Sequence, residues 1–241
     1  MGESSLVKPG MKPSGRIKPR ASFVNSKTFD ILAASPLIVW YGFGIAGIII
    51  KNASTLSHQY KAIDWGMALD LVAQLATMAF LGLQVILFLV RHLPIEKAPG
   101  VLARATGLVG ANLPFAFLLT SRVPLSMDWS VASTTATIVG TVTAVWVAFH
   151  LGRAFSISPQ ARKLVMIGPY RVIRHPLYLA EFVAMLGIML QHAQPLSGLI
   201  ALACTAAQFA RMHYEEIVLR SAFTSYGAYA AKTKRIIPLL Y

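Results

Sequence analysis

The chain alternates between long apolar runs and short polar connections. A helix needs about 20 apolar residues to cross the ~30 Å hydrocarbon core of a bilayer. Four runs meet that length, and two shorter ones follow, separated by Pro195, which predicts a tight helical hairpin. The runs are residues 29–50, 65–90, 102–120, 129–149, 178–194 and 196–212. The pattern predicts an all-α polytopic membrane protein of about six helices, with the last two forming a hairpin.

The basic residues lie almost entirely in alternate connections. Of the 22 Lys and Arg residues, all but Lys51, Lys61 and Arg122 fall in the two tails and in the second and fourth connections. Lys and Arg in short loops favour the cytoplasmic side. We therefore expect an integral membrane protein with both termini in the cytoplasm, in the cell inner membrane or the endoplasmic reticulum.

Composition excludes several classes of protein. Hydrophobic residues make up 56% of the 241 residues and charged residues only 13%, which is too apolar for an ordinary soluble enzyme. The net charge of +13 is placed between apolar blocks rather than on one polar face, so nucleic acid is not expected as a partner. The one cysteine, Cys204, lies inside an apolar run and is expected to be a buried packing residue.

The chain divides into three predicted regions. Residues 1–28 are rich in Lys, Pro, Ser and Gly, which predicts a disordered basic tail. Residues 29–149 contain the first four membrane helices, and residues 150–241 contain the polar connection, the hairpin and a C-terminal tail. Attraction of the first tail to anionic lipid headgroups and a role in topology alone both stay open.

Three apparent motifs are not expected to be catalytic. The sequence G-x-G-x-x-G at residues 42–47 lies inside an apolar run with no preceding strand, so its glycines are expected to let helices approach closely. The six histidines include no i,i+4 pair, so no metal site is expected. Asp70 and Gln74 are interpreted as a buried polar pair that holds helices together.

Residues 150–178 form the longest polar connection, and it is basic and aromatic. Gly168 and Pro169 predict a turn, and Pro176 suits the first turn of a helix. His175 is then expected at the helix N-terminus, where backbone N–H groups favour an anion, with Tyr178 on the same face.

A second polar group follows the last apolar run. Arg211 and Glu215 are four residues apart and are therefore neighbours on one helix face. A ligand with both an ammonium and a carboxylate would suit Glu215 and the basic connection, whereas a plain ion pair between Arg211 and Glu215 is the simpler alternative.

The two groups together resemble a known family. The run G-x-Y-x-x-x-R-H-P-x-Y at residues 168–178 and the run E-E-x-x-L at residues 215–219 are similar to the C-terminal half of the isoprenylcysteine carboxyl methyltransferases. Phospholipid N-methyltransferases and membrane thiol methyltransferases share much of this pattern. The resemblance covers about residues 145–241, and it leaves residues 155–161 without a confident alignment.

The resemblance implies methyl transfer from S-adenosyl-L-methionine in a pocket formed by the last helices and the cytoplasmic connections. It implies that one set of residues binds the cofactor: Arg162, Lys163, Leu164, Val165, Tyr170, His175, Pro176, Leu177, Tyr178 and Glu215. Arg211 takes the place of the arginine that faces the acceptor. For an amine or thiol acceptor a base is required, and Glu216 and His213 are the candidates.

The predicted acceptor is hydrophobic or lipidated: an isoprenylcysteine-like carboxylate, a lipid amine or a small thiol, entering from the lipid bilayer. Two other functions stay open. Membrane sterol-type NADPH reductases resemble the same hairpin, since a fold does not fix chemistry. A transporter or other non-enzymatic membrane protein is the second, although the chain has no evident internal repeat.

Overall fold

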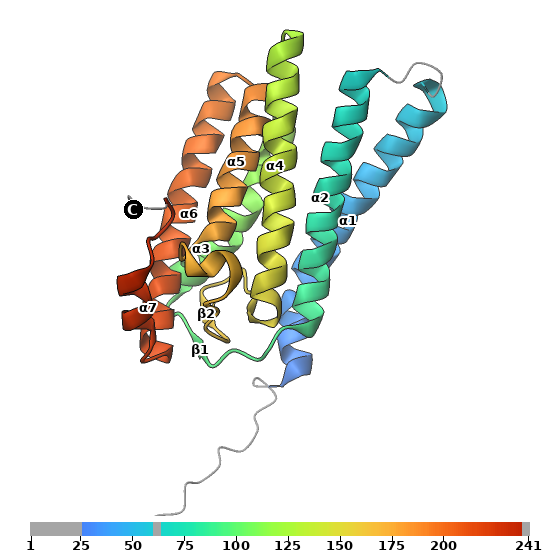
Figure 1. Ribbon diagram of the computed structural model, residues 1–241. Coiled ribbons are helices and arrows are strands. Elements are labelled where there is room, and N and C mark those ends of the chain that lie inside the picture. Colours follow the sequence, from blue (N-terminus) through green and yellow to red (C-terminus); the bar gives the residue numbers. More distant parts are fainter. Residues whose placement is uncertain (1–25, 60–63, 238–241) are drawn as a thin grey trace, which may run out of the picture.

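The computed structural model describes residues 26–59 and 64–237, and most of the predicted basic tail lies outside these residues. The described chain is a bundle of long helices with a very small sheet (Figure 1). The helices are α1 (Lys27–Gln59), α2 (Trp65–Val90), α3 (Val101–Asn112), α4 (Met127–Leu151), α5 (Pro176–Gln191), α6 (Pro195–Ala222) and α7 (Tyr226–Lys232). Strands β1 (Glu96–Lys97) and β2 (Gln160–Ala161) pair antiparallel.

Four helical segments have the length and apolar composition to cross a membrane: Lys27–Ser57, Trp65–Val90, Val101–Leu119 and Met127–Ala154. Helix α5 is shorter but also apolar. The predicted class, an all-α membrane protein with a final helical hairpin, is confirmed. Helix α7 and the small sheet lie together at the lower end of the bundle in Figure 1, which we call the polar end.

Three helices differ from the prediction. The first, α1, continues to Gln59 rather than ending at residue 50. The third begins as α3 and continues from Leu113 to Leu119 as a 3₁₀ helix, because Pro114 has no N–H for the α-helical ladder. Helix α6 continues to Ala222 rather than ending at residue 212. Hydropathy marks where the apolar part of a helix ends, whereas the backbone continues through the charged residues beyond it.

Small residues bring α4 and α5 into close contact. A Cβ at Gly140 would lie 2.3 Å from the backbone N of Ala184, and one at Gly187 would lie 2.4 Å from Thr137 Oγ1. Such small-residue contacts let helix backbones approach inside a membrane. Of the glycines at residues 42–47, Gly44 lies close to α2, since a Cβ there would be 3.3 Å from Leu81, whereas nothing lies within 4 Å of a Cβ at Gly42 or Gly47.

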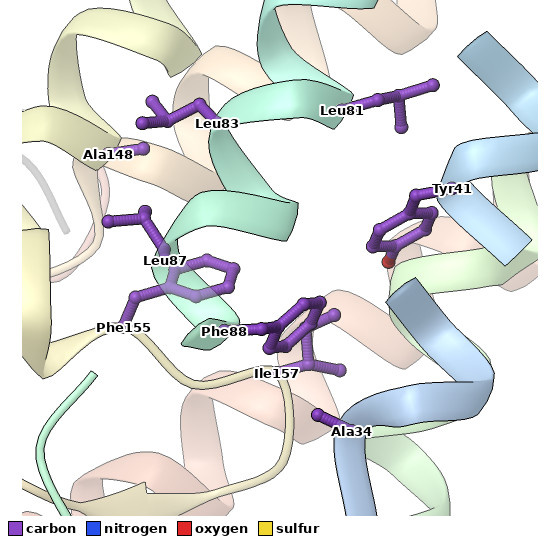
Figure 2. Close-up of a cluster of buried hydrophobic side chains, with 9 residues drawn as sticks. All are labelled: Ala34, Tyr41, Leu81, Leu83, Leu87, Phe88, Ala148, Phe155 and Ile157. Atoms are coloured by element: carbon purple, nitrogen blue, oxygen red, sulfur yellow. The ribbon is translucent and has the colours of Figure 1, made fainter. Parts of the chain in front are cut away.

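Aromatic packing joins α1 and α2 to the connection that follows α4. Tyr41 stacks on Phe88 with ring centroids 6.2 Å apart, and Phe88 meets the edge of Phe155 at 5.6 Å. Figure 2 shows these rings with Leu87 and Ile157 in one buried cluster. The cluster fixes the start of the connection against the first two helices.

We expect Gly187→Ala to destabilise the protein by about 1 to 3 kcal/mol, since the added methyl group meets backbone and Thr137 on α4. Thermal unfolding in detergent measures the change. Gly198→Ala is the matched control on α6, because nothing lies within 4 Å of its added Cβ. Equal stability of the two variants would contradict the close α4–α5 contact.

Candidate cofactor and acceptor site

Two glycines shape the connection between α4 and α5. Gly152 (φ +49°) ends α4, and Gly168 (φ +57°) begins the 3₁₀ turn Gly168–Arg171. Such positive φ values are strained for residues with a Cβ. His175 then caps α5, and Pro176 is its first residue, which confirms the predicted turn and helix start.

A cavity lies at the polar end, between this connection and helices α5, α6 and α7. Most of the predicted site residues line it: Lys163, Leu164, Val165, Tyr170, His175, Leu177, Tyr178, Arg211 and Glu215. Other lining residues were not among the predicted site residues: Ser156, Ser158, Gln160, Arg174, Tyr226 and Tyr229 are examples. Arg162, Pro176 and Glu216 are not among the lining residues.

Glu215 presents a carboxylate to the cavity beside two predicted partners. Tyr178 Oη donates a hydrogen bond to its Oε1, and His175 Nδ1 lies 3.8 Å from its Oε2. The rings of His175 and Tyr178 lie 5.5 Å apart, as expected for one face. The three side chains bring α5 and α6 together at the cavity.

Arg211 is buried, and its guanidinium lies 4.8 Å from the centre of the Tyr178 ring. Its Nη1 donates to Gln208 Oε1 at 3.1 Å. The ion pairs found among the described residues do not include one between Arg211 and Glu215. Arg211 Nε is buried without a hydrogen-bond partner, so this cation has a donor left for a ligand.

Glu181 is a polar residue that the sequence analysis missed. Its Oε2 accepts a hydrogen bond of 2.6 Å from Gln208 Nε2, so Gln208 links Glu181 to Arg211. The available signal was an acidic residue in an apolar helix, three positions after Tyr178.

Glu216 faces cations rather than the cavity. Its Oε1 lies 3.1 Å from Arg174 Nε, 3.1 Å from His175 Nε2 and 3.3 Å from Arg235 Nε. Burial alone would raise the pKa of Glu216, but hydrogen bonds and charge from His175 and Arg174 lower it to about 2. A carboxylate with this pKa is a poor proton acceptor near neutral pH.

Two tyrosines of α7 close the other side of the cavity. Tyr229 Oη donates to the carbonyl oxygen of Tyr170 at 2.7 Å, and burial raises the pKa of Tyr229 to about 12. Burial also raises the pKa of Tyr226, whose buried hydroxyl has no hydrogen-bond partner in the part of the chain that the structure describes. Both hydroxyls therefore stay protonated, and that of Tyr226 is available to a ligand.

Arg162 lies in a buried ion cluster outside this cavity. Its Nη2 is 2.9 Å from Asp30 Oδ1, while Arg91 Nε is 2.8 Å from Asp30 Oδ2. Asp30 was not singled out from the sequence, although an acidic residue in the first turn of a helix is a recognisable signal. The geometry gives Arg162 a structural partner and no contact with the cavity.

Two other polar groups also lie away from the cavity. Asp70 forms an ion pair with Arg122 at 3.0 Å, and both side chains are more than a third exposed. The expected buried Asp70–Gln74 pair was therefore wrong. His213 is exposed, with its ring against Tyr214. The described residues contain no group of three or more His, Cys, Asp or Glu side chains placed to hold a metal ion.

Most of the residues that line this cavity fall within a segment that matches a known family. Residues 129–226 match the family model of the phospholipid methyltransferases, which confirms the resemblance to integral membrane methyltransferases. The chain is also similar to two curated proteins, each 31% identical over 104 residues. They are the nickel-cobalt-cadmium resistance protein NccN of Alcaligenes xylosoxydans xylosoxydans and the cobalt-zinc-cadmium resistance protein CzcN of Cupriavidus metallidurans. The match covers 42% of this chain and 46% and 45% of those proteins, so the chain spans less than half their length.

We expect Asp30→Asn to destabilise the protein by about 3 kcal/mol, because Arg91 and Arg162 then lose their buried counter-charge. Thermal unfolding in detergent measures the loss. Asp70→Asn is the control, since its exposed pair with Arg122 contributes at most about 1 kcal/mol. A smaller loss for Asp30→Asn than for Asp70→Asn would refute the cluster.

Glu216→Gln is expected to lower stability at pH 7 by about 2 kcal/mol. The folded-state pKa of Glu216, about 2, lies below its ordinary 4.5, so the contribution is full above pH 4.5 and is lost as pH falls toward 2. The difference in the free energy of unfolding between the variant and the unmodified protein should thus stay constant from pH 7 to 5 and become smaller below pH 5. Unfolding measured over this pH range checks it, with Glu96→Gln, whose carboxylate meets Ser221, as control.

Proposed function

We propose that the protein is a methyltransferase that uses S-adenosyl-L-methionine and acts on a hydrophobic acceptor. The observation that carries the proposal is the cavity in which Glu215, Tyr178, His175 and Arg211 meet. The match of residues 129–226 to membrane methyltransferases supports the same chemistry.

The donors and acceptors of the cavity suit an amino-acid-like cofactor. Glu215 offers a carboxylate for an ammonium group, with Tyr178 and His175 fixing its position. Tyr226 Oη is a buried donor without a partner among the described residues, and Lys163 adds positive charge at the lining. A ligand that carries both an ammonium and a carboxylate would satisfy both sets. Apolar Leu164, Val165 and Leu177 supply the remaining surface.

When bound, the cofactor supplies a methyl group on a positively charged sulfur. Positioning does most of the catalytic work in such an in-line transfer. Arg211 is placed to hold an anionic acceptor, because its guanidinium is fixed by Gln208 and the Tyr178 ring and keeps a donor unused. The protein then needs to orient the acceptor and exclude water, and no proton has to move.

The geometry favours an acceptor that is already anionic. Of the two candidate bases, Glu216 is held by three cations and His213 is exposed, and neither lines the cavity. A carboxylate needs no base, whereas a thiol or an ammonium must first lose a proton. We therefore favour a carboxylate acceptor over a thiol or a lipid amine, with Glu216 positioning His175 rather than removing a proton.

The site lies at the polar end, where the charge pattern of the loops places the cytoplasm. In this orientation both termini are cytoplasmic. Leu177 and Tyr178, which line the cavity, belong to the apolar helix α5, which we expect to lie in the bilayer. The acceptor then enters from the bilayer.

Two alternative functions can be tested with the same samples. A nicotinamide-dependent reductase would bind its dinucleotide at this end of the hairpin, and a non-enzymatic membrane protein would bind neither cofactor. The names of the two curated relatives refer to metal resistance, which is a property of those proteins.

Glu215→Gln is expected to weaken binding of S-adenosylhomocysteine about 10- to 100-fold, since a charge-assisted interaction with the ligand ammonium is lost. Calorimetry on the detergent-purified full chain measures the affinity. Glu96→Gln, a carboxylate at the same end outside the cavity, is expected to leave it unchanged.

NADPH is titrated in parallel with the same samples. Binding of NADPH without S-adenosylhomocysteine would assign the protein to the reductases. Binding of neither would overturn an enzymatic role for this cavity, and equal affinity in the Glu215→Gln variant would overturn the assignment of Glu215.

A further inference from the structure

A second cavity lies at the polar end between α1, α3 and the loop of residues 156–160. Ala34, Phe88 and Ile157, which Figure 2 shows in one cluster, are among its lining residues. Ser156, Ser158 and Gln160 line both this cavity and the first one. The two cavities therefore share this loop as a wall. Most of the second cavity is formed by the part of the chain before residue 129, outside the family match.

Positive charge exceeds negative charge around the second cavity. Asp30 is the acidic residue in its lining, and Arg91 and Arg162 both pair with it. Lys97 and Arg104 also line the cavity, and neither forms an ion pair with the described residues. Both side chains are exposed, so they can reach an anionic group at the mouth of the cavity and form charge-assisted hydrogen bonds with it.

Much of the remaining lining is apolar and partly open. Leu93, Ile95 and Leu108 are 41%, 65% and 44% exposed, and Ala33 and Leu37 continue the apolar surface along α1. Ala33, Leu37 and Leu108 belong to helices that have the composition to cross a membrane, whereas Leu93, Ile95 and Lys97 lie in the connection between α2 and α3. The arrangement places an apolar surface beside cations, as at the headgroup level of a bilayer.

We infer that the second cavity binds the headgroup of an anionic amphiphile, with a phosphate or carboxylate at Lys97 and Arg104 and an apolar chain along Ala33, Leu37 and Leu108. A fully soluble anion would leave the apolar rim uncovered. A zwitterionic lipid would place the positive charge of its own headgroup near Lys97 and Arg104. An anionic lipid satisfies both surfaces.

The experiment measures lipid binding to the purified full chain by native mass spectrometry in non-ionic detergent, without any cofactor. Phosphatidylglycerol and phosphatidylcholine with the same acyl chains are the two lipid probes, and inorganic phosphate is the competitor. The charge variant is Lys97→Gln with Arg104→Gln, and its matched control is Lys232→Gln with Lys234→Gln, two exposed cations at the same end. The steric variant is Ala33→Trp, which fills the cavity, and its control is Ala46→Trp, exposed on the same helix.

We expect one molecule of phosphatidylglycerol to bind per chain, with an affinity at least about tenfold higher than that of phosphatidylcholine, because charge-assisted hydrogen bonds distinguish the two lipids. The charge variant should lose this preference and Ala33→Trp should lose binding, while both controls keep them. The site would be overturned if the charge variant kept the preference for phosphatidylglycerol, or if the control variants lost lipid binding to the same extent. Displacement of the lipid by inorganic phosphate at equal concentration would show a site for free anions and overturn the amphiphile.

Because the measurement needs neither cofactor nor turnover, it is separate from the test of the proposed function. Loss of S-adenosylhomocysteine binding with retained lipid preference would refute the methyltransferase and keep this site. The reverse result would keep the methyltransferase and refute this site.

Discussion

One carboxylate, that of Asp30, connects the two halves of the molecule. It lies in the first turn of α1 and binds Arg91, just after α2, and Arg162, just after β2. Breaking such a pair leaves uncompensated charge in a poorly hydrated place, so the three segments are held in one arrangement. The aromatic cluster of Tyr41, Phe88 and Phe155 holds the same segments by burial. The loop that separates the two cavities is therefore fixed at both of its ends.

The first cavity depends on a second set of contacts, those within the final hairpin. Tyr178 contacts both Glu215, through its hydroxyl, and Arg211, under its ring. Glu216, one residue further along α6, holds His175 and Arg174 from the other side. The two neighbouring glutamates therefore have different roles. Glu215 presents its charge to the cavity, whereas the charge of Glu216 is neutralised by the cations around it. The family match ends at residue 226, so α7 and its Tyr229 lie mainly beyond it.

The sequence was sufficient for features that depend on nearby residues. Apolar run length predicted α2 to the residue, and the Gly168 turn and the His175 cap followed from local backbone preferences. The break at Leu113 and the continuation of α6 to Ala222 were missed, although Pro114 was a local signal for the first. Asp30 could not be found in this way, because its partners are 61 and 132 residues away in the chain. Most of the residues that the resemblance implied do line one cavity. The resemblance could not show that Arg162 pairs with Asp30 instead of lining that cavity.

The loop of residues 156–160 also has a thermodynamic consequence. Gly107 of α3 leaves room for this loop, since a Cβ there would lie 2.7 Å from the carbonyl oxygen of Ile157. That same oxygen lies 3.5 Å from Arg211 Nη2 in the first cavity, while Ile157 lines the second. The backbone of this one loop thus forms part of the wall of both cavities. Any ligand that shifts it changes the free energy of binding on the other side, and by linkage the effect is equal in both directions. With the two proposed ligands in place, we therefore expect the lipid composition of the surrounding membrane to change the affinity of the first cavity for the cofactor.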